Sequence, residues 1–314
     1  MIYDRSMRFL ALFVLAAMSG AAPAQTIGMN SWIHATANLD RIVRFYFEAF
    51  GLGSPAPPGP PNPAVPALLN VPGAKLRVAM LRFPGSPFGF ELTNFGSDIE
   101  LHPGQPRPWD PGAARLIVEM PNIDAALAAL KKAGAAVVTR SGVPVKMRDG
   151  RVVVVRDPDG YLIELAESRE PGASMGLAVR DIQETAKFYR EMLGFEVRGL
   201  AEFASDTSLS DVLDLPSGAP HRVMTAVVPG TNAVMRFWEF KRLNGAIFRN
   251  QVPDPGTPAI SLRVTDLDGL LKRLKAAGTP VISAGGAPVQ FSPTIRNVFV
   301  EDPNGLKVEL YEQK

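Results

Sequence analysis

Hydrophobic and polar positions follow one recurring order along this chain. In 115–120, RLIVEM, apolar residues return at every second position, as in a strand with one buried face. Asn122 then offers a helix N-cap, Ile123 and Leu127 fall on one helical face, and Gly134 supplies a C-terminal stop. Three short apolar segments follow, AAVV, VKMRDGRVVVVRD and YLIELAE. The pattern predicts a βαβββ module, meaning a strand, a helix and three further strands.

The same order occurs four times, in an A-B-A′-B′ arrangement that we number as modules 1 to 4. The repeated segments are 38–52 with 181–195, 115–138 with 259–282, and 157–167 with 302–312. The last pair, DPDGYLIELAE and DPNGLKVELYE, has Pro second and Gly fourth, which is typical of a type I turn between two strands. We therefore expect an α+β fold in which four modules pair into two domains with curved mixed sheets, at 30–168 and 174–314.

Two long insertions interrupt this order at equivalent places. Residues 51–73 contain eight prolines, and 201–221 include a predicted short helix, SLSDVLDL. Each lies between the second and third strands of its module. Two interpretations stay open: tolerated loop insertions, or lids over a binding cleft.

The first 24 residues differ from the rest. Arg5 and Arg8 precede an apolar run, and Ala22-Pro23-Ala24 fits a small-x-small cleavage site. A run of about 10 apolar residues is too short to span a bilayer. We predict a signal peptide over 1–24, a periplasmic or secreted location, and no membrane association after cleavage.

Composition narrows the chemistry. The chain has no cysteine, which excludes disulfides, thiolate catalysis and Cys-based metal sites. The formal net charge is +2 and no long charged block occurs, so nucleic acid is not an expected partner. We expect a small-molecule ligand, and a monomer or homodimer.

The FYREMLGFEV and DPxGxxxEL segments within four βαβββ modules resemble the vicinal oxygen chelate superfamily. That group includes glyoxalase I, bleomycin-resistance proteins, fosfomycin-resistance enzymes and extradiol dioxygenases. The resemblance covers nearly all of 30–312. It implies paired modules around a cleft, with a divalent metal held by a residue on each first strand, usually His, and by a Glu on each last strand.

We transferred these metal-ligand positions to this sequence, and none of the residues found there is a histidine. The first-strand positions are Ser31, Arg115, Ser174 and Ala259, and the last-strand positions are Glu91, Glu164, Arg236 and Glu309. An arginine about 5 Å from a dication would cost about 6 kcal/mol at an effective dielectric near 20. We therefore expect no cofactor and at most a weakly bound divalent metal. In its place we predict Arg–Glu pairs, Arg115 with Glu91 or Glu164, and Arg236 with Glu309.

Two histidines need separate treatment. His34 lies three residues beyond Ser31, an odd offset that puts it on the helix-packed face of its strand as a hydrogen-bonded core residue. A bulge in the strand would turn it into the cleft, where it could join Glu91 or Glu164 as a metal ligand. His221 begins a strand of module 3 and could face the second cleft.

Three functions remain open. The first is an exported enzyme, a metal-independent or weakly metal-dependent lyase or isomerase that acts on a small apolar or aromatic carbonyl compound. The second is a non-catalytic small-molecule binding protein of the bleomycin-resistance type. The third is a metal-dependent lyase or dioxygenase with a displaced His ligand. The candidate catalytic residues are Glu164, Glu91 and Arg115, and the candidate binding residues are Ser31, Ser174, Arg236, Glu309 and His221.

Overall fold

The computed structural model describes residues 26–53, 62–216, 218–241, 243 and 245–314. Within these ranges no helix has the length and apolar character needed to cross a membrane. The predicted signal peptide lies outside the described residues, so its cleavage stays a prediction.

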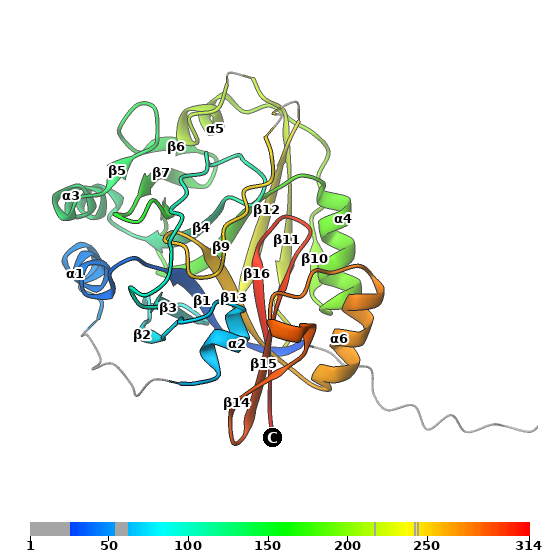
Figure 1. Cartoon of the computed structure of the whole chain (residues 1–314). Coiled ribbons are helices and arrows are strands. Elements are labelled where there is room, and N and C mark those ends of the chain that lie inside the picture. Colours follow the sequence, from blue (N-terminus) through cyan, green and yellow to red (C-terminus); the bar gives the residue numbers. More distant parts are fainter. Residues whose placement is uncertain (1–25, 54–61, 217, 242, 244) are drawn as a thin grey trace, which may run out of the picture.

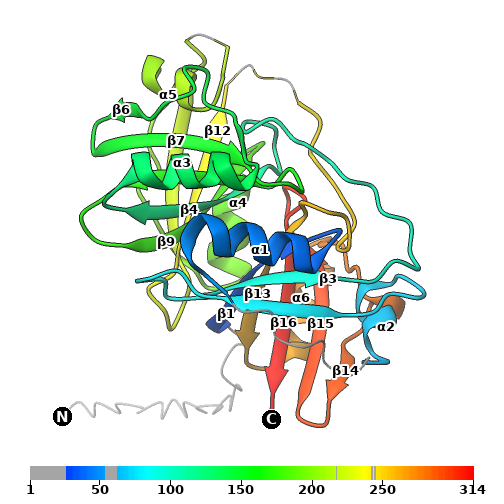
Figure 2. The ribbon, with the colours of Figure 1, turned by 90° about the vertical axis from the view of Figure 1, so that its left-hand side faces the viewer.

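Seven strands form the first sheet, sheet A, which combines modules 1 and 4 (Figures 1 and 2). The first strands of the two modules, β1 and β13, run antiparallel at its centre, with Ser31 opposite Ser261. In sheet order the strands are β14 (Val289–Ser292), β15 (Ile295–Glu301), β16 (Lys307–Gln313), β13 (Pro258–Val264), β1 (Thr26–Ala35), β3 (Gly89–Asn94) and β2 (Arg77–Leu81).

Nine strands form the second sheet, sheet B, which combines modules 2 and 3 in the same way. Its central antiparallel pair is β4 with β9, and Arg115 stands opposite Gly176. In sheet order the strands are β10 (Glu196–Arg198), β11 (His221–Val227), β12 (Val234–Phe240), β9 (Gly172–Val179), β4 (Ala114–Met120), β8 (Leu162–Glu167), β7 (Gly150–Arg156) and β5 (Ala136–Val137), and β6 (Val145–Met147) pairs with β7.

The predicted fold of four repeated modules in two curved mixed sheets is confirmed. The predicted pairing of modules 1 with 2 and 3 with 4 is wrong, because each sheet takes one module from each half of the chain. The physical reason is that first strands meet through backbone hydrogen bonds, which carry no side-chain signature. The boundaries 30–168 and 174–314 therefore describe sequence repeats and do not separate the sheets.

A layer of helices fills the space between the two sheets. Its members are α1 (Leu39–Phe50), α3 (Ile123–Ala133), α4 (Ile182–Lys187) continued by the π-helix η1 (Phe188–Met192), and α6 (Leu267–Ala276). Helix α1 packs on α3 (Figure 2), and η1 packs on α6. One apolar core joins these helices to the inner faces of both sheets. The predicted N-cap Asn122 and C-cap Gly134 of α3 are confirmed, the glycine with a φ of 103° that favours this residue.

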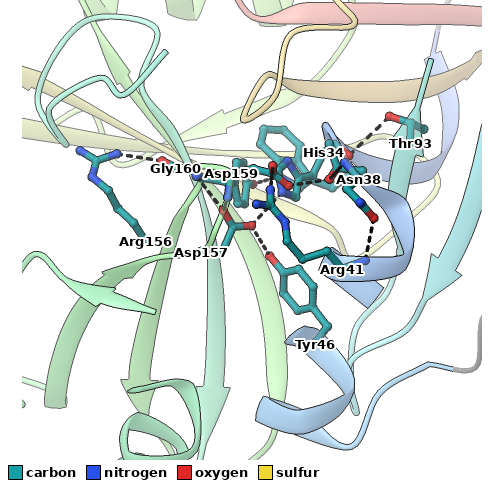
Figure 3. A network of polar contacts seen from close by, with 12 residues as sticks. His34, Asn38, Arg41, Tyr46, Thr93, Arg156, Asp157, Asp159 and Gly160 are labelled. Carbon is teal, nitrogen blue, oxygen red and sulfur yellow. Dashed lines mark hydrogen bonds and ion pairs between the residues drawn. The ribbon is translucent and has the colours of Figure 1, made fainter. Parts of the chain in front are cut away.

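The repeated DPxG turns dock on the repeated Phe-Tyr pairs across this helix layer. Asp157 accepts hydrogen bonds from two backbone N–H groups of its own turn, from the Tyr46 hydroxyl at 3.3 Å, and pairs with His34 Nε2 at 2.8 Å (Figure 3). In the other half, Tyr189 donates to Asp302 at 3.1 Å. Burial raises the pKa of Asp302 to about 6. These buried turns thus join module 1 to module 2 and module 3 to module 4, whereas the sheets join module 1 to module 4 and module 2 to module 3.

The two insertions each place a short helix over the outer, concave face of a sheet. Helix α2 (Val65–Leu69) packs on β14 and β15, and α5 (Thr207–Val212) packs on β6 and β7. A 3₁₀ turn, η2 (Ala284–Gly286), contacts α2. The predicted short helix in 201–221 is confirmed. Helix α2 belongs to module 1 and covers strands of module 4, and α5 belongs to module 3 and covers strands of module 2. Each helix thus closes a cleft over its sheet, one on each side of the molecule.

Candidate functional site

Two clefts lie on the outer faces of the sheets, and we call them cleft A and cleft B after their sheets. Cleft A holds a cavity of about 370 Å³ under helix α2. Cleft B holds a wider groove of about 900 Å³ under helix α5. Both are built from equivalent strands, so their differences come from side chains.

Two carboxyl groups face each other in cleft A. Glu91 lies on β3 and Glu309 on β16, and both line the cavity. The Ser31 hydroxyl donates to Glu91 Oε2 at 2.7 Å, and the Asn297 amide donates to Glu309 Oε1 at 2.6 Å.

Burial is the main cause that raises the pKa values of both carboxyls. The pKa of Glu91 rises to about 7, through burial and through repulsion by Glu309, with the Ser31 hydrogen bond opposing the rise. The pKa of Glu309 is raised by burial, while hydrogen bonds from Ser261 and Asn297 oppose the rise. Both carboxyls therefore hold their protons to a higher pH than a solvated glutamate does.

Apolar residues make up most of the remaining lining of cleft A, although Asn30, Thr93, Tyr311 and Gln313 also line it. Inserted helix α2 contributes Val65, Leu68 and Leu69, and the sheet contributes Phe95 and Phe299 among others. Of the described lining residues, none is Arg, Lys or His. The cavity therefore suits a neutral, largely apolar molecule that presents a few polar atoms to the carboxyl pair.

Cleft B is organised around arginines. Arg115 on β4 is almost fully buried, its Nε donates to Glu164 Oε2 at 2.6 Å, and its guanidinium carbon lies 3.9 Å from the ring centroid of Trp238. Nearer the groove mouth, Arg236 pairs with Glu119 at 2.9 Å. The electrostatic character is thus that of paired opposite charges.

The predicted Arg–Glu pairs have divided outcomes. The pair of Arg115 with Glu164 is confirmed. The pair of Arg236 with Glu309 is wrong, because Arg236 lies in sheet B and Glu309 in sheet A. For the same reason Glu91 does not share a cleft with Glu164. Both errors arose because we expected module 1 to pair with module 2 and module 3 with module 4. The strand positions that we carried over did not cause them.

The first-strand positions also divide between the clefts. Ser31 and Ala259 lie on the central strands of sheet A, and Ser174 lies on β9 of sheet B. Ser174 is buried and its hydroxyl has no hydrogen-bond partner among the described residues. Ala259 is buried in the apolar lining of sheet A and offers no polar atom.

The histidines do not enter the clefts. His34 is fully buried on the helix side and bonded to Asp157 (Figure 3), and its ring stacks on Tyr161, as predicted for a core residue. Strand β1 does contain two irregularities in its pairing with β13, between Thr26 and Gly28 and between Met29 and Ser31, but both precede His34 and leave its facing unchanged. His221 is half-buried near Phe240, with its pKa lowered by burial, and it is not among the residues that line the cleft B groove. The displaced-histidine metal site is therefore contradicted for His34.

Sequence reasoning missed four residues that shape the sites. Ser261 and Asn297 hydrogen-bond Glu309 in cleft A, and Trp238 and Glu119 hold the two arginines of cleft B. Ser261 and Trp238 each lie two residues beyond a carried-over position, on the same face of the strand. Alternation could therefore have found them.

The residues present do not fit the metal centre that the resemblance implies. In cleft B, the guanidinium of Arg115 already engages the Glu164 carboxylate. In cleft A, the donors are oxygen atoms only, and the Ser31 hydroxyl is donated to Glu91. Among the described residues no group of three or more His, Asp or Glu is arranged to hold a metal ion. So few charged oxygen donors would hold a hard cation such as Mg²⁺ only weakly.

Sequence comparison gives matches along nearly the whole chain. A family model described as Glyoxalase/Bleomycin resistance protein/Dioxygenase superfamily matches residues 30–165 and 173–310. Lactoylglutathione lyase of Oryza sativa subsp. japonica is 26% identical over 170 residues, which cover 52% of this chain and 53% of the relative. Lactoylglutathione lyase GLX1 of Arabidopsis thaliana is 24% identical over 264 residues, which cover 76% of this chain and 87% of the relative. The match to the rice relative thus spans about half of that protein's length.

Solved structures show the same architecture. Glyoxalase I from Zea mays aligns with a TM-score of 0.58 at 17% identity, covering 92% of this chain and 93% of that one. A putative dioxygenase from Bacillus subtilis aligns with a TM-score of 0.53 at 15% identity, covering 92% of this chain and 86% of that one. At these identities the likeness concerns the fold.

Proposed function

This chain belongs to the glyoxalase/bleomycin resistance protein/dioxygenase superfamily, and from that premise we propose that cleft A is the active site of a metal-independent lyase or isomerase. The reaction is proton transfer next to the carbonyl group of a small apolar or aromatic compound. One observation carries the proposal: two carboxyls with raised pKa values, Glu91 and Glu309, share an apolar cavity. Carboxyls in such surroundings act as acid and base near neutral pH.

The hydrogen bonds around each carboxyl suggest their roles. Asn297 and Ser261 donate to Glu309 and favour its ionised form, so Glu309 is the base. Glu91 keeps its proton up to about pH 7 and is the acid. The Glu309 carboxylate takes the proton from the carbon beside the carbonyl, and Glu91 donates its own proton to the carbonyl oxygen, which gives a neutral enol or enediol. For a hydroxyketone the intermediate is an enediol. Protonated Glu309 returns its proton to the former carbonyl carbon, and the Glu91 carboxylate takes the proton of the other hydroxyl, which forms the new carbonyl group. Both carboxyls regain their starting states, and no atom is gained or lost.

The substrate we propose is neutral. The described lining of cleft A has no cationic side chain, and its two carboxyls would repel an anionic substrate. The relatives named lactoylglutathione lyases support a lyase or isomerase class for this chain. Their substrate is not carried over, since the cavity of this chain lacks cationic groups among its described residues.

The test uses 2-hydroxyacetophenone, a neutral aromatic hydroxyketone. In D₂O with a chelator present, the wild-type protein should exchange the protons beside the carbonyl for deuterium, measured by proton NMR. Glu309→Gln should slow this exchange at least about a hundredfold. Glu312→Gln is the matched control, because Glu312 lies three residues further on β16, pairs with Arg296 and does not line the cavity. Exchange that needs added metal, or that survives in Glu309→Gln, would refute the mechanism.

The absence of a cationic group among the described lining residues also favours a second function, small-molecule binding without turnover, since no described positive charge in the cavity would stabilise an enolate. Saturable binding of 2-hydroxyacetophenone by calorimetry, with no deuterium exchange, would favour it over catalysis.

We also propose that the protein is exported, on the basis of the apolar segment that follows Arg8. N-terminal sequencing of protein from the periplasmic or culture fraction should begin at Gln25. An intact Met1 or Met7 on exported protein would contradict this route.

A further inference from the structure

We propose that cleft B is a second ligand site, which binds a small carboxylate with an apolar body through the guanidinium of Arg115. This inference does not rest on the activity proposed for cleft A. It begins from an imbalance in the hydrogen bonding of one buried side chain.

Arg115 is fixed in place from three sides. Its Nε donates to Glu164, and its guanidinium stacks on Trp238. The strand opposite carries Gly176, where an added Cβ would come within 2.8 Å of the Trp238 ring and 3.0 Å of Arg115 Cγ. The missing side chain at Gly176 thus leaves the space in which the guanidinium lies across the sheet.

The two outer nitrogens of this guanidinium make no hydrogen bond with the residues that the structure describes. Arg115 is only 1% exposed, and its Nη1 and Nη2 are both buried with no hydrogen-bond partner among the described residues. A guanidinium keeps its charge and all five N–H donors in a protein. Buried donors without an acceptor are costly, which favours an acceptor that binds there.

The other arginines of the groove do not share this feature. Arg236 pairs with Glu119, Arg151 pairs with Glu167, and both side chains are about one-third exposed. Arg148 and Arg169 are exposed to water. Among the described lining residues, Arg115 is therefore the cation that combines burial, fixed geometry and unpaired donors.

The geometry selects a carboxylate. Nη1 and Nη2 present parallel N–H groups that match the two oxygens of a planar carboxylate. The groove lining holds five arginines and five carboxylates, so it carries no net positive charge and would not favour a dianion such as phosphate, least of all beside Glu164. Leu209 and Val212 of helix α5, together with Met147, supply an apolar wall for the body of the ligand. Because both Nη atoms are covered, binding requires groove side chains to move aside.

The experiment compares hexanoate with hexanamide, which has the same shape and no charge, by titration calorimetry on the full-length mature protein. Hexanoate should bind at least about tenfold more tightly than hexanamide. The double variant Arg115→Met with Glu164→Gln removes both charges of the pair together, and it should lose at least about tenfold in hexanoate affinity. The double variant Arg198→Met with Glu196→Gln is the matched control, because it removes an exposed ion pair that lines neither cleft, and it should bind hexanoate as the wild type does.

A second measurement covers the case in which the double variant does not fold. The Nη signals of Arg115, in protein labelled with ¹⁵N-arginine, should shift on addition of hexanoate and stay unchanged with hexanamide. The proposal is overturned if hexanoate does not bind at about 10 mM, a Kd limit that already corresponds to very weak affinity. It is equally overturned if both probes bind alike, or if the Arg115 signals do not respond.

Discussion

Clefts A and B occupy equivalent places in the repeat yet carry opposite chemistry. Where cleft A has Ser31, Ser261 and Tyr311, cleft B has Arg115, Gly176 and Trp238. In cleft A, serine hydroxyls hydrogen-bond two carboxyls that repel each other. In cleft B, an arginine reaches over a glycine to stack on a tryptophan and neutralise its carboxylate. The scaffold fixes where the groups meet, and a few substitutions decide whether the result is a titrating pair or an ion pair.

This difference between the clefts also gives them different effects on the stability of the fold and on its pH dependence. A buried carboxyl pair with raised pKa values weakens the fold as pH rises, and such strain is a feature of reactive sites. A buried ion pair with one group removed leaves an uncompensated charge. Cleft B should therefore dominate the stability measurements and cleft A the pH dependence.

The largest effect is expected from Arg115→Ala. Glu164 would be left buried without its partner, so the free energy of unfolding should fall by about 3–5 kcal/mol, measured by urea denaturation. The combined change of Arg115→Met with Glu164→Gln should cost clearly less, because no unpaired charge remains. Equal losses in the two variants would show that packing on Trp238, and not charge, holds the cleft together.

The same variant addresses the metal question. Arg115→Ala frees one carboxylate in cleft B, while Glu119 stays paired with Arg236 and Glu91 lies in the other cleft. We expect no gain in Mn²⁺ affinity by calorimetry, because a single carboxylate is too weak a site. Tight Mn²⁺ binding by Arg115→Ala would contradict this account of the module pairing.

An intermediate effect is expected in the pH dependence of stability. Burial and Glu309 raise the pKa of Glu91 from its ordinary value near 4.5 to about 7, so between these values the folded protein holds more protons than the unfolded chain. The free energy of unfolding should therefore fall as pH rises from about 5 to about 8, with Glu91 contributing about 2–3 kcal/mol. Glu91→Gln should flatten this fall in melting experiments. A wild-type curve as flat as that of the variant would show that the carboxyl is solvated.

The smallest effect is expected from Ser31→Ala. The Ser31 hydrogen bond lowers the pKa of Glu91, so its loss should raise that pKa further. If Glu91 is the acid, the alkaline limb of the deuterium-exchange rate should move to higher pH by about half to one pH unit. Ser174→Ala, at the equivalent position of sheet B, should leave the limb in place. A limb unmoved by Ser31→Ala would remove Glu91 from the role of acid.

The carried-over positions show how far sequence reasoning reaches. Alternation placed Arg115 and Glu164 on one face of adjacent strands, and their pair is confirmed because both belong to the same module. The same reasoning failed for Arg236 with Glu309, since that pair would have to cross between modules 3 and 4. His34 was placed correctly in the core, because its facing depends only on alternation within β1.

The sequence by itself determined the modules: the order of their strands and helices, their caps, the DPxG turns and the face on which each side chain lies. These features follow from local propensity and from periods of two and 3.6 residues, which a single sequence displays. Only the tertiary structure decided which modules share a sheet, and hence that Glu91 meets Glu309 and that Arg115 lies over Gly176. The ladders between β1 and β13 and between β4 and β9 are made by backbone groups that every module offers alike, so no pattern of side chains distinguishes the partners.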